Sequence, residues 1–338
     1  MKKFSVRLLV AVLFAGLVIG AAPISFAQDD ADEFMLEEIT VTAQKREENQ
    51  QKVAIAMEVI TGEDLVATGK DNVDEILKNI PNALINTGSD GMRISLRGIT
   101  DDSSGQSNQR VSDSAVALNI DGAYNNMANA GQNLFDIERV EVLMGPQSTM
   151  YGSNAPGGVV NVVTASPKTD KWSGNASVEY GSYDLLNLQG ALNVPIIQNK
   201  VALRVAASNS QQGSYIDGDS DSDTTAVRVK TLYQPFEKLS FEVTGNYSVR
   251  SGGDMMGGSV KPFIDQDGYY PDGTKVTDPW TAAESEEGGM GGGEENLSDQ
   301  TTKGLTANIE WETPWGNITA TTSYSKSKSE SSGERVGS

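Results

Sequence analysis

The sequence predicts an α+β domain followed by antiparallel transmembrane β-barrel strands, of which about seven are present. Three observations predict this order: an export leader, a region that mixes helix caps with short strands, and a long region in which polar and apolar residues alternate. The predicted segments are a leader at 1–27, a periplasmic lead at 28–48, the α+β domain at 49–168 and the barrel strands at 169–338.

The leader has the three parts of a secretory signal peptide. Basic residues open it, an apolar run extends from Leu8 to Ala22, and Ser25-Phe26-Ala27 supplies small residues before the expected cleavage point. The run is shorter than the roughly 20 apolar residues that a spanning helix needs. We therefore expect cleavage after Ala27 and export of the remaining chain.

Composition excludes several functions. The formal net charge is −20, and loss of the three basic leader residues makes the mature chain about three units more negative, so a nucleic-acid partner is not expected. Histidine and cysteine are both absent. Their absence removes thiol nucleophiles, histidine-based triads, thiolate metal sites and disulfides, and the sequence gives no sign of an enzyme.

The α+β domain is marked by caps and short strands. Thr61 and Asp64 form a capping pattern for a short helix to about Thr68, and Asn72 caps a second helix that Pro81 stops. The connection between Gly145 and Gly158 is rich in glycine and proline and predicts tight turns rather than helix. The expected strands are Val53–Ile60, Arg93–Arg97, Ala115–Ile120 with an Asp121-Gly122 turn, Arg139–Leu143 and Val159–Thr164.

After Trp172 each strand has one apolar and one polar parity. Arg204, Arg228 and Lys230 share the polar parity with Glu242, which predicts a wet barrel interior, because a soluble sandwich would bury its apolar parity and expose the charges. The apolar parity comprises Leu186, Leu188, Leu192, Val194, Val201, Leu203, Val205, Val227, Val229, Tyr233, Phe241, Val243, Tyr247, Val249, Leu305, Ala307, Ile309, Trp311, Ile318, Ala320 and Tyr324.

Short and long connections alternate along these strands, as in barrels with short periplasmic turns and longer external loops. The aromatic residues Tyr233, Tyr247, Trp311 and Trp315 are candidates for the interfacial girdle. Seven strands cannot close a barrel, and an eight-stranded barrel is too narrow to enclose a domain of about 100 residues. Barrels that enclose such a domain have about 22 strands, so we expect that roughly two thirds of the barrel lies outside this sequence.

Three segments carry a family resemblance. FDIERVEVLMGPQSTMYGSNAPGGVVNVVT (Phe135–Thr164), together with Arg93–Gly98 and Leu118–Gly122, closely resembles the plug domain of TonB-dependent outer-membrane receptors. The likeness runs from about Glu37 to Thr164. Met144 and Ser148 depart from the family pattern around the GPQ segment, where charged residues are common. The resemblance implies a plug inside an outer-membrane barrel of a Gram-negative bacterium.

The segment EEITVTAQKR after the acidic lead alternates Ile39 and Val41 with threonines, which suits addition as a strand either to a partner or to the chain's own sheet. In sequence and position it resembles the family's TonB box, the segment that the periplasmic energy-transducing protein TonB binds. The short lead leaves no room for an additional signalling domain. The box comprises Glu38, Ile39, Thr40, Val41, Thr42 and Ala43.

Two polar loops and an acidic run are candidate ligand sites. The resemblance implies that some plug loops face the external ligand, with Arg110, Asn125 and Asn126 as contacts and Tyr124 as an aromatic platform; solvated connections are the alternative. The acidic run lacks the glycine and glutamate of a calcium loop, so it predicts a solvated loop or a weak calcium site. Its residues are Asp217, Asp219, Asp221 and Asp223.

The resemblance implies binding of a scarce solute and its import with energy transduced through the TonB box. Ferric siderophore, cobalamin and oligosaccharide all remain open as the small-molecule ligand, and haem is less favoured without histidine. No cofactor is expected, and outer-membrane lipids are expected neighbours. The alternatives are a passive porin or adhesin, or a barrel-type outer-membrane enzyme; neither explains the box and the plug-like segment.

Overall fold

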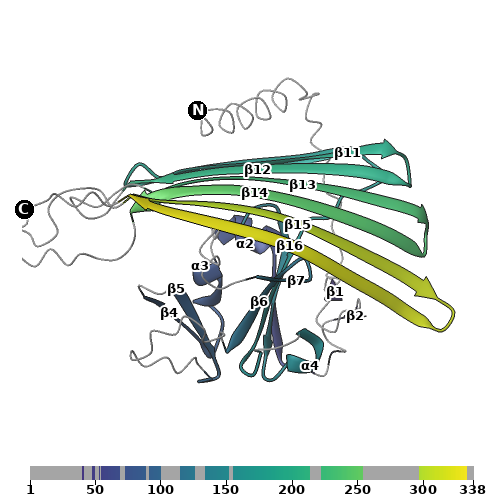
Figure 1. The fold of residues 1–338 in the computed structure, drawn as a ribbon, viewed down its shortest axis with the longest axis horizontal. Coiled ribbons are helices and arrows are strands. Elements are labelled where there is room, and N and C mark those ends of the chain that lie inside the picture. Colours follow the sequence, from purple (N-terminus) through teal and green to yellow (C-terminus); the bar gives the residue numbers. More distant parts are fainter. Residues whose placement is uncertain are drawn as a thin grey trace, which may run out of the picture.

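The computed structural model describes residues 40–41, 48–49, 53, 55–68, 73–88, 91–99, 115–125, 134–151, 155–213, 222–253 and 297–332. They form two layers, in which a small α+β domain lies against one face of a long antiparallel sheet (Figure 1). None of the helices in these ranges has both the length and the apolar character needed to cross a bilayer.

The α+β domain is built on a five-stranded mixed sheet in the order β3-β8-β9-β6-β7. Strands β6 and β9 run parallel, and the other neighbours are antiparallel. All the predicted strands of this sheet are confirmed within a few residues. The predicted strands of this sheet are Met57–Thr61 (β3), Val116–Ile120 (β6), Ile137–Met144 (β8) and Gly158–Thr164 (β9), and the sheet also contains Ala123–Asn125 (β7).

Two short helices follow β3, α2 (Gly62–Thr68) and α3 (Val73–Leu77). The predicted cap of α2 is confirmed, because the backbone N–H of Asp64 donates to Thr61 Oγ1 at 3.2 Å and Thr61 Oγ1 donates to Asp64 Oδ2 at 2.7 Å. These bonds satisfy a backbone donor that the first turn of a helix leaves without an intrahelical partner.

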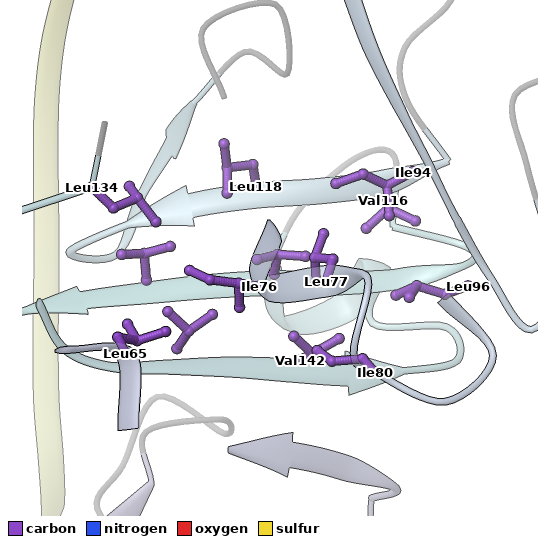
Figure 2. Close-up of a cluster of buried hydrophobic side chains, with 13 residues drawn as sticks. Leu65, Ile76, Leu77, Ile80, Ile94, Leu96, Val116, Leu118, Leu134 and Val142 are labelled. Atoms are coloured by element: carbon purple, nitrogen blue, oxygen red, sulfur yellow. The ribbon is translucent and has the colours of Figure 1, made fainter. Parts of the chain in front are cut away.

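One face of the five-stranded sheet carries the main apolar core (Figure 2). Alternate strand residues point to this face, as the two-residue period of a strand requires, and the helices and strand β5 cover it. The core residues are Leu65, Ile76, Leu77, Ile80, Ile94, Leu96, Val116, Leu118, Leu134, Val140, Val142, Val160 and Val162.

Two two-stranded sheets flank this domain. Strand β4 (Ala83–Gly88) pairs with β5 (Gly91–Leu96), and β1 (Thr40–Val41) pairs with β2 (Glu48–Asn49). In Figure 1, β4 and β5 lie toward the end of the long sheet where the long connections emerge, and β1 and β2 lie toward the end with the short turns.

The long sheet contains seven strands in sequential order, all antiparallel. The segments 198–200, 237–238 and 314–315 join strands at one end, and the segments 181–185, 213–221 and 254–296 join them at the other, so the predicted alternation is confirmed. The strands are Ser173–Tyr180 (β10), Leu186–Ile197 (β11), Val201–Gln212 (β12), Ser222–Phe236 (β13), Leu239–Gly253 (β14), Leu297–Thr313 (β15) and Gly316–Ser332 (β16).

The polarity of the long sheet is inverted relative to a soluble sandwich, as predicted. Lys230 is 2% exposed and Arg228 is also buried, on the face that meets the α+β domain. On the other face Leu305, Ile309 and Trp311 are exposed. Apolar side chains therefore face outward and charged ones inward, the arrangement of an outer-membrane barrel wall. Within the described residues the sheet is open, with β10 and β16 as its edges.

Two local predictions are wrong, and one strand was not predicted. The connection before β9 contains a one-turn helix, α4 (Ser148–Tyr151), in which the N–H groups of Met150 and Tyr151 both donate to the carbonyl of Gln147. Strand β4 was not predicted, and β7 extends into the segment from Tyr124 that was expected to be a polar loop. All three elements are short and are held by pairing or by tertiary contacts that local patterns do not record.

Candidate functional site

The contact between the α+β domain and the long sheet is a set of buried charges, and it begins at a tight turn. Asp121 (φ 49°) and Gly122 (φ 77°) join β6 to β7 in the left-handed conformation that a two-residue type I′ hairpin requires, as the Asp-Gly pair predicted. The Asp121 carboxylate accepts hydrogen bonds from the backbone N–H of Thr164 at 2.9 Å and from its hydroxyl at 2.7 Å. The turn is thereby tied to the last residue of β9.

Lys230 on β13 reaches the same carboxylate from the opposite layer. Its Nζ lies 3.3 Å from Asp121 Oδ2 and 3.4 Å from Glu242 Oε1. It also donates to the carbonyl of Thr164 at 3.1 Å. Lys230 is only 2% exposed, and burying an ammonium group is costly when it has no partners. These three oxygens supply the partners that offset this cost.

A second anchor lies at the start of β8. Asp136 forms a two-pronged ion pair with Arg204 of β12, in which Arg204 Nε donates to Asp136 Oδ2 at 2.7 Å. Beside it, the Arg228 guanidinium donates to the carbonyl of Phe135 at 2.7 Å and lies over the Phe135 ring, 4.4 Å from the ring centroid. Phe135 itself packs against alanines of three wall strands.

The α+β domain supplies the carboxylates of Asp121 and Asp136 to these contacts, and the wall supplies the basic residues Arg204, Arg228 and Lys230 together with the carboxylate of Glu242. Paired and hydrogen-bonded in this way, they fix the orientation of the domain against strands β12 and β13. The sequence placed the three basic residues on the inner parity, but it did not identify their partners.

Next to these anchors, a cleft of about 110 Å³ separates β6 and β7 from the wall. It is smaller than the roughly 300–1,000 Å³ of a typical small-molecule pocket. Tyr124 and Asn125, two of the predicted ligand contacts, both line it, and the Tyr124 side chain is 53% exposed. Arg110 and Asn126 lie outside the described residues. The ligand role of all four residues stays a prediction.

The GPQ segment is held by close backbone packing. Gly145 (φ 101°) donates its N–H to the carbonyl of Gly157, and Gly158 (φ 149°) lies so close to β8 that an added Cβ would stand 2.2 Å from the Leu143 carbonyl oxygen. Glycine is therefore required at Gly158 by both conformation and space.

A buried carboxylate lies beneath this segment. Glu141 accepts from Arg139 Nε at 2.8 Å and from Asn161 Nδ2 at 3.0 Å. Burial raises the pKa of Tyr151, and the negative charge of Glu141 raises it further. Tyr151 therefore stays a neutral phenol at any physiological pH.

The predicted TonB box is described at Thr40 and Val41 only. These residues pair with Asn49 and Glu48 of β2, and the Val41 side chain is fully buried in a cluster with Leu143 and Val159. The segment thus occupies a strand of the chain's own fold here, one of the two arrangements left open by its pattern. Glu38, Ile39, Thr42 and Ala43 lie outside the described residues.

Of the acidic run, only Asp223 is described. It sits in β13 and accepts from Asn209 Nδ2 at 3.3 Å. Asp217, Asp219 and Asp221 lie outside the described residues, so the calcium site stays a prediction.

The chain is similar to known receptors in sequence. Residues 49–159 match the family profile named TonB-dependent Receptor Plug Domain. The chain is 33% identical over 172 residues to the "Iron-regulated outer membrane virulence protein" of Vibrio cholerae, which covers 48% of this chain and 24% of that protein. It is 29% identical over 171 residues to the "Pesticin receptor" of Yersinia pestis, which covers 49% and 24%. The match therefore spans about a quarter of these relatives' length.

Solved structures share the fold. The ferric yersiniabactin uptake receptor of Yersinia pestis superposes with a TM-score of 0.62 at 19% identity, covering 82% of this chain and 41% of that one. The siderophore receptor PiuA of Acinetobacter baumannii gives a TM-score of 0.63 at 18% identity, covering 88% and 39%.

A plug-profile match and curated relatives from the outer membrane thus agree with a small domain docked on the charged face of an antiparallel wall. Residues 49–159 are therefore a TonB-dependent receptor plug domain, and the chain is similar over about half its length to receptors of the Gram-negative outer membrane.

Proposed function

We propose that this protein binds a ferric siderophore at the external side of the plug and imports it with energy transduced by TonB through residues Glu38–Ala43. The observation that carries the coupling half of the proposal is the attachment of Val41. Its side chain is buried against the plug, and among the described residues its strand pairs with β2 at Thr40 and Val41. A segment held in this way is docked but can be withdrawn.

The energies are compatible with withdrawal. Burying a valine contributes about 1.5–3 kcal/mol, and each backbone hydrogen bond contributes roughly 0.5–1.5 kcal/mol net. Strand addition to a partner over about six residues would supply a ladder of backbone hydrogen bonds in place of the β1 contacts. The partner's ladder therefore offsets the loss of the β1 contacts.

The choice of ligand class is supported by the relatives. One is named for iron regulation, and the structural neighbours include receptors for ferric yersiniabactin and ferripyoverdine. A test must distinguish a ferric siderophore from cobalamin and from an oligosaccharide.

The test is uptake by cells that express the intact gene and lack their other iron receptors. Radioactive iron would be supplied as a panel of hydroxamate, catecholate and phenolate siderophores, beside labelled cobalamin and a labelled oligosaccharide. The proposal predicts saturable uptake of at least one ferric siderophore and none of the other two classes. Non-saturable entry of all small solutes would indicate a porin, and selective uptake of cobalamin or sugar would contradict the ligand class.

A further inference from the structure

On the outward face of strands β15 and β16, apolar and charged residues occupy separate levels. Leu305, Ile309 and Trp311 share the outward parity of β15, and their register partners on β16 are Tyr324, Ala320 and Ile318. Apart from Ala320, the side chains of this band are each at least 38% exposed. From Leu305 to Trp311 the apolar band extends about 20 Å along the strand at 3.3 Å per residue.

A row of lysines stands immediately above this band, on the side of the long connections. Lys303 precedes Leu305 by two residues and points to the same face of β15. Its direct register partner on β16 is Lys326. Both side chains are exposed. Lys303 Nζ lies 5.6 Å from the centroid of the Tyr247 ring, and Tyr324 is 67% exposed beside the row. Lysine and tyrosine together mark the level where apolar lipid gives way to headgroups.

The pairing of Lys303 with Lys326 is unfavourable by itself. Like charges directly opposite each other on neighbouring strands destabilise a sheet. The next residue of this parity, Lys328, forms an ion pair with Glu330, so its charge is largely compensated within the chain. Within the part of the chain that the structure describes, neither Lys303 nor Lys326 forms an ion pair, and an external anion held between them would relieve their repulsion.

Two further carboxylates share this face. Asp299 is the register partner of Glu330, one row above Lys328, and Asp223 lies in the same row on β13. The acidic row stands farther from the apolar band than the lysines do. An anion attached to the lipid surface therefore meets the lysines first.

We propose that Lys303 and Lys326 bind the phosphate groups of a phosphorylated glycolipid in the outer leaflet, with Tyr247 and Tyr324 packing against its sugar and upper acyl region. A lipid source fits better than a soluble one for a geometric reason: the lysines lie at the rim of the apolar band and face away from the plug, where a free phosphate gains no apolar contact.

The test uses the intact receptor purified in a zwitterionic detergent and mixed with lipid A, which carries two phosphates, or with its dephosphorylated form. Lipid retained after gel filtration is quantified by mass spectrometry. One lysine near a charged membrane surface contributes about 1 kcal/mol, or about five-fold in affinity, so K303Q/K326Q is expected to weaken lipid A binding roughly 25-fold. The effect should shrink at high salt.

The matched control is K200Q/K238Q, which removes two exposed lysines at the opposite, short-turn end of the wall. It is expected to leave binding unchanged. Equal binding by the wild type and K303Q/K326Q, equal loss in the control, or equal binding of the dephosphorylated lipid would each overturn the proposal. Displacement of lipid A by inorganic phosphate at the same concentration as by unlabelled lipid A would also overturn it, because the site would then be one for free phosphate.

A stability measurement separates the proposal from a folding defect. K326Q leaves Lys303 over Tyr247 and removes the like-charge pair, so in lipid-free detergent this variant should melt no lower than the wild type. With lipid A added, the wild type should gain more thermal stability than K326Q. A variant that melts lower in both conditions, by the same margin, would contradict the proposal.

Discussion

Lys230 of the wall strand β13 lies 3.3 Å from Asp121 at the tip of a plug hairpin, and both side chains are almost completely buried. Because Asp121 also holds the end of β9 through Thr164, this one ion pair connects the plug turn, the end of the plug sheet and the wall. Removing one partner leaves the other as an uncompensated buried charge.

Substitution K230M is therefore expected to destabilise plug docking by about 3–5 kcal/mol, and D121N/K230M to recover a substantial part of that loss. Resistance of the plug to protease across a urea series measures the change in the intact receptor. K238M, at an exposed turn, is the control and should have no effect. Additive losses in the double variant would show that the pair is not coupled.

Gly158 should be the least replaceable glycine of the GPQ segment. A Cβ there would meet the Leu143 carbonyl oxygen at 2.2 Å and Leu96 Cδ1 at 2.7 Å, with φ at 149°. We expect G158A to cost about 3 kcal/mol or more from strain and overpacking, whereas G145A, which has open space, should cost about 1–2 kcal/mol from its φ of 101° alone. Chemical denaturation followed by protease resistance ranks the two; equal losses would contradict the close approach.

Val41 should control how tightly the coupling segment is docked. V41A removes two buried methyl groups and is expected to weaken docking by about 1–3 kcal/mol, which is several-fold or more in the undocked population. Trypsin cleavage at Lys45 and Arg46, between β1 and β2, reports that population by its rate. L84A is the control, because Leu84 is a 70% exposed apolar residue of the plug. No acceleration in V41A would show that Val41 does not hold the segment.

Tyr151 should give stability a pH dependence on the alkaline side. Its pKa is raised above the ordinary value of 10.0 by burial and by Glu141, so above pH 10 the unfolded chain ionises this phenol while the folded chain does not. The stability contribution is complete below pH 10 and is lost as the pH rises toward the folded pKa. The stability of the wild type relative to Y151F should therefore fall as the pH rises above 10. Parallel pH profiles for the two proteins would contradict the raised pKa.

The sequence predicted the elements whose signals are local. The Asp-Gly turn at Asp121, the Thr61 cap and the alternation that places Lys230 inside the wall are all read within a few residues, and all are confirmed. The helix α4 was missed because Gly and Pro around it suggested turns, whereas the Gln147 carbonyl closes a single helical turn there.

The sequence could not predict which residues far apart in the chain form pairs. Nothing in the sequence around Asp121, Asp136 or Lys230 shows which acid meets which base, since the paired residues lie far apart along the chain. For the same reason the burial of Val41 could not be predicted: its alternating pattern fits an intramolecular strand and a partner's sheet equally well.

The most direct test of the central claim separates binding from import in cells that express the intact gene. Deletion of Glu38–Ala43 is compared with deletion of residues 29–34, an equally long segment of the lead, while ferric siderophore binding and radioactive iron uptake are both measured. Coupled import predicts that the first deletion abolishes uptake and leaves binding intact, and that the second changes neither. Undiminished uptake after deletion of Glu38–Ala43 would contradict energy transduction through this segment.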